Sequence, residues 1–234
     1  MRKNILFIDN GTEFRGKIID ILVEADVNFC VRDWWGLFPE ADYKFAMYDG
    51  VIFSGSKQNV FEDDHPRAHW KYMEELPKLL ICYSQQLYLF DNHDIPVIEC
   101  NGEEGELEES DVLILNDSVL FEGIDFKEKP YVYHYHWYIP QSLPSHYKIT
   151  TSTEFTPFGS WENEKEKVYA FQWHPEVLPH TKKILHNFIN LILLGELLRL
   201  ILKTIDKYQK IYIFIIKQSL CLLRVKHNKG FSQW

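Results

Sequence analysis

The chain has 234 residues, of which 46% are hydrophobic and 25% charged, a composition that excludes disordered and collagen-like proteins. The formal net charge of −9 argues against nucleic acid as a partner, because phosphate binding requires concentrated positive charge. The four cysteines form no CxxC pair and the first apolar run reaches Asp9 too soon for a signal peptide, so we expect a reducing, cytoplasmic location.

Short apolar runs alternate with amphipathic stretches in the first hundred residues. The runs predict buried strands, and the stretches between them predict helices. The strands are expected at residues 5–8, 27–31, 51–53 and 79–81, and the helices at 14–25 and 70–76. Because strand, helix and strand follow one another, this order predicts a parallel sheet with helices on both faces.

The sequence pattern changes after Ile98. Short apolar segments separated by turn residues predict antiparallel or mixed strands there. They lie at residues 112–115, 119–121, 131–133 and 147–149, and are followed by a strand at 168–171 and a closing helix at 180–194. The expected fold class is therefore α/β, a three-layer sandwich with a central, mostly parallel sheet.

The last part of the chain differs in charge from the rest. Residues 198–234 contain eight basic residues and one acidic residue, so this segment is near +7 and residues 1–197 are near −16. We predict one domain over 1–197 and a basic, apolar, helical tail over 198–234. The tail's apolar run at 211–216 is well short of the roughly 20 residues that span a bilayer. A helix that contacts a membrane or a partner and an extension without a role are both open.

A cysteine follows one of the predicted buried strands directly. The segment Leu79-Leu80-Ile81-Cys82-Tyr83-Ser84-Gln85-Gln86 runs from an apolar strand into a helical pattern. A nucleophile at such a turn is exposed, and the helix N-terminus stabilises a thiolate and offers N–H groups to an oxyanion. Taken alone, a cysteine in this position is more often a packed small hydrophobic residue.

A histidine and a glutamate follow the predicted strand at 168–171. They belong to Phe171-Gln172-Trp173-His174-Pro175-Glu176, and their spacing lets the carboxylate orient the imidazole. Taken alone, this segment also fits a turn with a polar histidine. Because open α/β sheets carry their active sites at strand ends, the two segments together point to a cysteine–histidine–glutamate site.

The sequence resembles the class I glutamine amidotransferases, whose cysteine turn reads G-I-C-x-G-H-Q and whose second motif reads Q-x-H-P-E. Residues 77–86 (PKLLICYSQQ) align with the first motif and residues 171–177 (FQWHPEV) with the second. Residues 8–11 (IDNG) and 52–60 (IFSGSKQNV) also resemble family segments, in the same order. The resemblance covers roughly residues 3–195 and implies a flavodoxin-like fold.

The family's functional residues are transferred only to matching positions. The resemblance implies that Cys82 is the nucleophile that forms a γ-glutamyl thioester, that His174 is the base and acid, and that Glu176 orients His174. It further implies an oxyanion hole and a group of glutamine-binding residues. The oxyanion hole would use backbone N–H groups of Tyr83 and of Gly55 or Ser56, and glutamine would be bound by Gln86 and by His134 or His136.

Three departures from the family pattern keep other functions open. Leu80 and Ser84 replace glycines on either side of the nucleophile, and no acid follows His136 where many relatives have one. The leading hypothesis is a glutaminase that supplies ammonia to a synthetase partner. A stand-alone γ-glutamyl peptidase is an alternative with the same chemistry, and a non-catalytic regulatory or binding subunit is a third.

No pattern in the sequence predicts a metal or a cofactor. The acidic run at 103–109 is expected to be a solvated loop, and His65 and His69 lack a third ligand with clear spacing. The phosphate-binding signature GxxxxGK[ST] is absent from the sequence, so activation of an ammonia acceptor would take place elsewhere. A small-molecule substrate and a synthetase partner are therefore expected.

Overall fold

The computed structural model describes residues 2–33, 45–61, 68, 70–100 and 109–192, together with 204, 205 and 209. The chain divides into two units, Met1–Ile192 and Leu193–Trp234. The first unit contains the α/β fold. Most of the second unit lies outside the described residues, as does most of the predicted helical tail, so the boundary at 197/198 stays a prediction.

An eight-stranded sheet forms the centre of the first unit, in the order β2-β1-β3-β4-β12-β11-β10-β7. The strands from β2 to β12 are parallel, and β11, β10 and β7 continue the sheet in antiparallel pairing. The strands are β1 (Asn4–Asp9), β2 (Asn28–Asp33), β3 (Gly50–Phe53), β4 (Lys78–Ile81), β7 (Leu113–Ile114), β10 (Lys148–Ser152), β11 (Ser160–Asn163) and β12 (Val168–Phe171).

Two short antiparallel pairs lie outside the main sheet. One joins β5 (Val97–Glu99) to β9 (Tyr138–Pro140), and the other joins β6 (Glu109–Asp111) to β8 (Tyr131–Tyr133). These pairs hold the segment between β8 and β9 at both ends. That segment borders the candidate active site described below.

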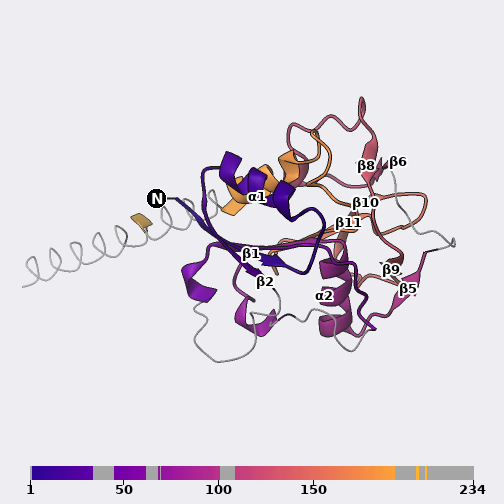
Figure 1. Ribbon diagram of the computed structural model, residues 1–234, viewed down its shortest axis with the longest axis horizontal. Coiled ribbons are helices and arrows are strands. Elements are labelled where there is room, and N and C mark those ends of the chain that lie inside the picture. Colours follow the sequence, from indigo (N-terminus) through magenta and orange to yellow (C-terminus); the bar gives the residue numbers. More distant parts are fainter. Residues whose placement is uncertain are drawn as a thin grey trace, which may run out of the picture. The chain divides into compact units, whose positions relative to one another are not determined.

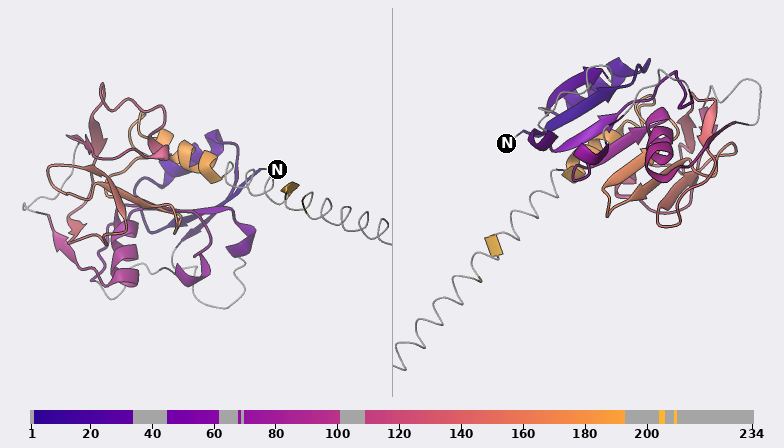
Figure 2. Two further views of the ribbon diagram at one scale, coloured as in Figure 1. Left: turned by 180° about the vertical axis from the view of Figure 1, so that it is seen from behind. Right: turned by 90° about the horizontal axis from the view of Figure 1, so that it is seen from below.

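Helices cover both faces of the sheet, as the sequence predicts. Helix α1 (Arg15–Glu24) and the helical residues 183–192 lie on one side, and α2 (Tyr83–His93) lies on the other (Figure 1 and the left view of Figure 2). The turns η2 (Phe45–Met47) and η3 (Trp70–Tyr72) belong to the α2 side, since Phe45 and Trp70 share its hydrophobic core. The predicted three-layer α/β architecture is confirmed.

Alternate residues of the strands supply two separate cores. In β4, Leu79 and Ile81 pack with the apolar face of α1, whereas Leu80 packs with α2. Successive side chains of a strand point to opposite faces, so a strand covered on both sides must be apolar throughout. This requirement explains the continuous apolar runs at β1, β3 and β4.

Two predicted elements were wrong. The predicted strand at 119–121 is a 3-10 turn, η4 (Val119–Phe121), because the Ser118 side chain accepts a hydrogen bond from the Leu120 N–H and caps the turn. The predicted helix at 70–76 is a single 3-10 turn, η3, followed by turns that lead into β4. None of the described helices has the length and apolar character needed to cross a bilayer.

Candidate active site

Cys82 occupies the sharp turn between β4 and α2. Its φ of 52° and ψ of −112° lie in a region that costs free energy for a residue with a side chain. Its backbone N–H donates to the Phe171 carbonyl of β12 at 2.6 Å, and its carbonyl accepts from the Gln85 N–H of α2 at 3.1 Å. The neighbouring strand and the helix therefore fix the strained turn from both sides.

His174 and Glu176 follow the strand that pairs with β4. Because β4 and β12 are parallel neighbours, the residues after their carboxyl ends lie at the same edge of the sheet. The His174 N–H donates to the Tyr133 carbonyl at 2.8 Å, which fixes the segment against β8. His174 Nδ1 lies 2.9 Å from Glu176 Oε1, and both side chains are buried. This distance orients the imidazole and directs Nε2 away from the carboxylate.

The electrostatic surroundings favour a charged His174. Burial alone lowers the pKa of His174, but the charge of Glu176 and the interaction with Cys82 outweigh burial and raise the pKa to about 10. His174 Nε2 is buried without a hydrogen-bond partner among the described residues. The imidazole is therefore held by Glu176 on one side and interacts with Cys82 on the other, the order of groups found in cysteine–histidine nucleophiles.

Gly55 lies between the cysteine and the histidine. A Cβ added at Gly55 would lie 3.0 Å from His174 Cε1, 3.4 Å from Cys82 Cβ and 3.7 Å from His174 Nε2. The loop after β3 therefore approaches the Cys82 and His174 side chains closely. Only glycine leaves this space open.

We expect Gly55→Ala to lower kcat/KM for amide hydrolysis at least about tenfold, since a misplacement of the imidazole by a fraction of an ångström weakens its alignment with Cys82. Steady-state kinetics on glutamine, the substrate that the sequence resemblance implies, measure the effect. Gly16→Ala in α1 is the matched control, because a Cβ at Gly16 meets nothing within 4 Å. Equal activity of the two variants would contradict the close approach at Gly55.

Ser84, one of the departures from the family pattern, belongs to a buried polar cluster. Its hydroxyl donates to the Ser54 carbonyl and accepts from Asn10 Nδ2 at 2.9 Å. Asn10 Nδ2 also donates to the Ser54 carbonyl at 3.0 Å, and the Asn10 N–H donates to Ser54 Oγ at 2.9 Å. The cluster ties the loops after β1 and β3 to the first turn of α2, so Ser84 holds together the loop that carries Gly55.

Leu80, the second departure, is accommodated by its neighbours. It is fully buried in the core on the α2 side, and its partner in β12 is the small residue Ala170. Its partner in β3 is Phe53. The core on the α2 side therefore has room for the leucine side chain. Because Leu80 lies two residues before the turn, it does not prevent Cys82 from adopting its strained backbone conformation.

A network of side-chain amides contacts Cys82 Sγ. Gln172 Nε2 donates to Cys82 Sγ at 3.8 Å, and Gln172 Oε1 accepts from Gln85 Nε2 and, at 3.3 Å, from Gln86 Nε2. Gln86 Nε2 also donates to the Tyr138 carbonyl at 2.7 Å. Trp161 completes the network through its indole N–H, which donates to Gln85 Oε1. The Gln172 amide thus presents a donor to the sulfur.

His134 and His136 are buried beside the site and bonded to each other. His134 Nδ1 lies 3.0 Å from His136 Nε2, and His136 Nδ1 lies 3.4 Å from Cys100 Sγ. Between them, the Tyr135 carbonyl lies 3.6 Å from Cys82 Sγ. The structure therefore brings the backbone of this segment to Cys82, and hydrogen bonds of the two histidine rings continue from there to Cys100.

Sequence reasoning missed two neighbours of the site and left a third without a role. Phe14, just before α1, packs edge-on against His174 with ring centroids 4.8 Å apart, and the Tyr135 ring approaches the same imidazole. Loop placement alone brings these rings to His174, and no local pattern indicates that. Gln172 stands in the second motif, so its position after a strand end was a usable signal.

The described residues contain no group of three or more histidine, cysteine or acidic side chains that could hold a metal ion. The predicted acidic loop and His65 and His69 lie outside the described residues, apart from Glu109 in β6. The site itself offers a thiol, an imidazole, a carboxylate and amides. These groups support acyl transfer through a covalent cysteine intermediate.

Known proteins resemble this chain in sequence over most of the first unit. Residues 6–191 match the model of the family described as "Glutamine amidotransferase class-I". A GMP synthase [glutamine-hydrolyzing] of Clostridium botulinum is 34% identical over 152 residues, which cover 63% of this chain and 29% of that protein. The enzyme of the same name from Maridesulfovibrio salexigens is 33% identical over 189 residues, covering 79% of this chain and 36% of that protein. The chain thus spans about a third of these relatives' length.

Solved structures resemble the chain in fold. A candidate GMP synthase subunit from Thermoplasma acidophilum superposes with a TM-score of 0.66 at 18% identity, covering 85% of this chain and 98% of that one. A glutamine amidotransferase from Thermotoga maritima superposes with a TM-score of 0.57 at 19% identity, covering 90% and 94%. The architecture, the cysteine turn and the match over residues 6–191 lead to one conclusion: the chain belongs to the class I glutamine amidotransferase family.

Proposed function

We propose that this protein hydrolyses the side-chain amide of glutamine through a γ-glutamyl thioester on Cys82 and supplies the ammonia to a synthetase partner. The observation that carries the proposal is the convergence of Cys82, on a strained strand-to-helix turn, with the His174–Glu176 pair at the same edge of the sheet. Such a constellation is recognised by geometry and by the role of each group.

Acylation begins with attack of the Cys82 thiolate on the amide carbon of glutamine. The carbonyl oxygen gains negative charge, which we propose is held by backbone N–H groups of Tyr83 and of Gly55 or Ser56. Tyr83 opens α2, where N–H groups point out of the helix end. As the C–N bond breaks, the protonated His174 gives a proton to the leaving nitrogen, so ammonia departs and the thioester remains.

Deacylation reverses the role of the imidazole. Neutral His174 takes a proton from a water molecule, whose oxygen attacks the thioester carbon. The C–S bond then breaks, glutamate leaves, and Cys82 returns as a thiolate beside a protonated His174. Glutamine and water are thereby converted to glutamate and ammonia, and no redox partner is needed.

We propose that Gln86, His134 and His136 shape the wall that binds glutamine. Gln86 is tied to the Tyr138 carbonyl and to Gln172, and the two histidines hold the segment whose carbonyl lies beside Cys82 Sγ. Because these side chains form hydrogen bonds with other protein groups, we propose that they fix the shape of the glutamine site. The γ-carboxamide of glutamine would enter between that segment and Gly55.

A synthetase partner is proposed because hydrolysis of glutamine by itself serves only to release ammonia. The relatives at 33–34% identity are named as glutamine-hydrolysing GMP synthases, and this chain corresponds to about a third of their length. The sequence carries no GxxxxGK[ST] signature for activation of an acceptor. The proposal is therefore that ammonia passes to a synthetase that activates the acceptor.

The proposed function is tested by incubating the full chain with L-glutamine and measuring ammonia and glutamate together. Equal, Cys82-dependent release of both products is expected, and γ-glutamyl peptides are assayed in parallel. Turnover of the peptides alone would replace the proposal with a γ-glutamyl peptidase. If the folded protein turned over neither substrate, even with an ammonia-consuming synthetase added, a non-catalytic subunit would be the remaining function.

Glu176→Gln is expected to reduce kcat/KM about 10²-fold and to shift its alkaline limb to lower pH. The Glu176 charge raises the pKa of His174, so removing that charge lowers the pKa and the imidazolium is lost at a lower pH. The pH profile of kcat/KM for both proteins measures the shift. A variant profile that coincides with the wild-type profile would show that Glu176 does not act through His174.

A further inference from the structure

A pocket of about 390 Å³ lies at the opposite end of β4 and α2 from Cys82. Lys78, the first residue of β4, forms part of it, whereas Cys82 follows the last residue of that strand. Four residues of strand separate the two by about 13 Å at the usual rise per residue. The pocket therefore lies outside the site that carries the proposed chemistry, and its volume is within the range of small-molecule sites.

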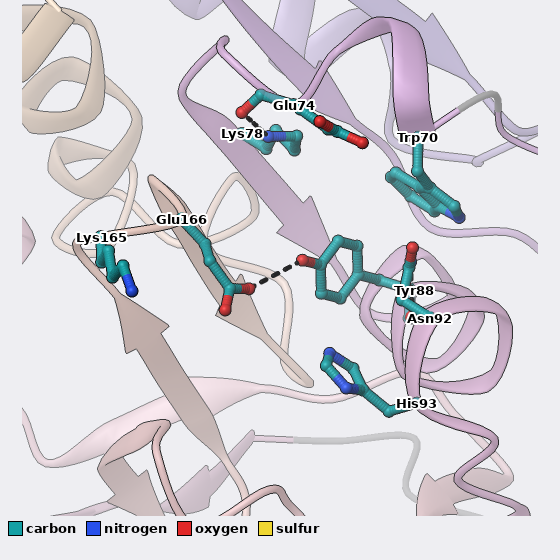
Figure 3. A pocket seen from close by; sticks show the side chains of 8 residues that line it. All are labelled: Trp70, Glu74, Lys78, Tyr88, Asn92, His93, Lys165 and Glu166. Atoms are coloured by element: carbon teal, nitrogen blue, oxygen red, sulfur yellow. Dashed lines mark hydrogen bonds between the residues drawn. The ribbon is translucent and has the colours of Figure 1, made fainter.

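The eight side chains that line the pocket come from three parts of the chain and surround one space (Figure 3). Its floor is buried and is formed by Lys78, Trp70 and Tyr88. Its rim is exposed and includes Glu74 and Lys165. The full lining is Trp70, Glu74, Lys78, Tyr88, Asn92, His93, Lys165 and Glu166.

Lys78 presents an ammonium group at the floor. Its Nζ donates to the backbone carbonyls of Leu76 at 2.9 Å and Glu74 at 3.1 Å. An ammonium carries three N–H groups, and no third partner for Nζ belongs to the described part of the chain, so one donor remains. Burial lowers the pKa of Lys78 to about 8, and the group therefore still carries its proton at neutral pH in most molecules.

Glu166 presents a fixed carboxylate across the pocket. Its Oε2 accepts from the Tyr147 hydroxyl at 2.7 Å and the Tyr88 hydroxyl at 3.1 Å, and its Oε1 lies 3.4 Å from His146 Nε2. The Tyr147 hydroxyl also lies 2.6 Å from His93 Nε2. This network holds the carboxylate in one orientation, and its two oxygens have further acceptor positions.

Two aromatic rings, those of Trp70 and Tyr88, line one side of the pocket. Trp70 and Tyr88 meet nearly at a right angle, with ring centroids 5.1 Å apart and an interplanar angle of 83°. The Trp70 indole N–H donates to Asp91 Oδ2 at 2.8 Å, which fixes the ring. The two rings pack edge to face against each other and together form the apolar side of the pocket.

We propose that this pocket binds an aromatic α-amino acid as a zwitterion. Two lysines and two glutamates line the pocket, so the lining matches a ligand that carries one charge of each sign better than it matches a simple anion or cation. The ligand carboxylate would meet Lys78 and Lys165, and the ammonium would meet Glu166 and Glu74. The ring would lie against Trp70 and Tyr88.

The test uses the full chain with Cys82→Ala, so that binding is measured without turnover and independently of the proposed glutaminase activity. L-phenylalanine, L-tyrosine and L-tryptophan are titrated calorimetrically, and saturable binding of at least one, at one molecule per chain, is expected. Phenethylamine and 3-phenylpropionate each lack one charge and should bind at least about tenfold more weakly, because hydrogen bonds between charged groups are lost.

Two variants locate the binding in the pocket. Glu166→Gln removes the fixed negative charge with little change of shape, and Lys165→Glu reverses an exposed rim charge. Each should weaken binding at least about tenfold, whereas Lys127→Glu, the same charge change at an exposed residue outside the lining, should not. Thermal unfolding verifies that each variant is folded. The absence of binding by all three amino acids at millimolar concentration, or equal binding by all variants, would overturn the proposal.

Discussion

Replacing Cys82 by alanine is expected to lower kcat/KM for glutamine hydrolysis by about 10⁴-fold or more, because the proposed acyl intermediate forms on the Cys82 sulfur. The substitution removes one sulfur atom and keeps the Cβ that packs beside Gly55. Thermal unfolding should therefore stay close to that of the wild type. Product release and unfolding are measured on the same preparations.

Cys30→Ala is the matched control for this loss. Cys30 is a half-buried cysteine of β2, far along the sheet order from β4. Its removal should leave kcat/KM unchanged within about twofold, since the side chain touches no proposed reacting group. Retention of full glutaminase activity in Cys82→Ala, with the contaminating activity of a mock purification subtracted, would contradict the assignment of the nucleophile.

Replacing His174 by asparagine is expected to reduce kcat/KM by about 10³-fold, within the usual range for loss of a general acid–base group. The asparagine cannot exchange a proton near neutral pH, so neither departure of ammonia nor attack of water is assisted. The buried Glu176 also loses the partner that lies 2.9 Å away. The pH dependence of the residual activity should lack the limb due to the imidazole.

His186→Asn separates this effect from the general loss of a histidine. His186 Nε2 lies 3.4 Å from Glu24 on the surface of the first unit, away from the edge that carries Cys82. Its replacement should change activity little, because surface ion pairs contribute at most about 1 kcal/mol to stability. If His174→Asn and His186→Asn had the same activity and the same pH profile, His174 would not be the proton-transfer group.

The sequence predicted the elements whose side-chain pattern is decided locally. The strands β1, β3, β4 and β12 are buried on both faces, and this burial produces the continuous apolar runs that reveal them. Strand β11, with the sequence Ser160-Trp161-Glu162-Asn163, was missed because polar residues interrupt its apolar pattern. It is a strand because its backbone pairs with β12 and β10, contacts that only the folded sheet supplies.

In the candidate site, too, some residues could be located from the sequence and others only from the fold. Cys82, His174 and Glu176 could be located from sequence because each follows a recognisable strand, and parallel neighbours bring their ends together. The contribution of Ser84 could not be foreseen, since its hydroxyl acts on Ser54 and Asn10, residues distant in the sequence. The contacts of Phe14 and Tyr135 with the imidazole likewise depend on how loops meet in the fold.

The proposed function depends on one step, the attack of Cys82 on the side-chain carboxamide of a bound glutamine. A diazoketone analogue of glutamine tests it most directly, because it alkylates a nucleophile only when the analogue occupies the glutamine site. We predict one label per chain, on the peptide that contains Cys82, with L-glutamine protecting against it and no label on Cys30 or Cys100. Folded protein that took up no label, or label on another residue that glutamine did not prevent, would contradict it.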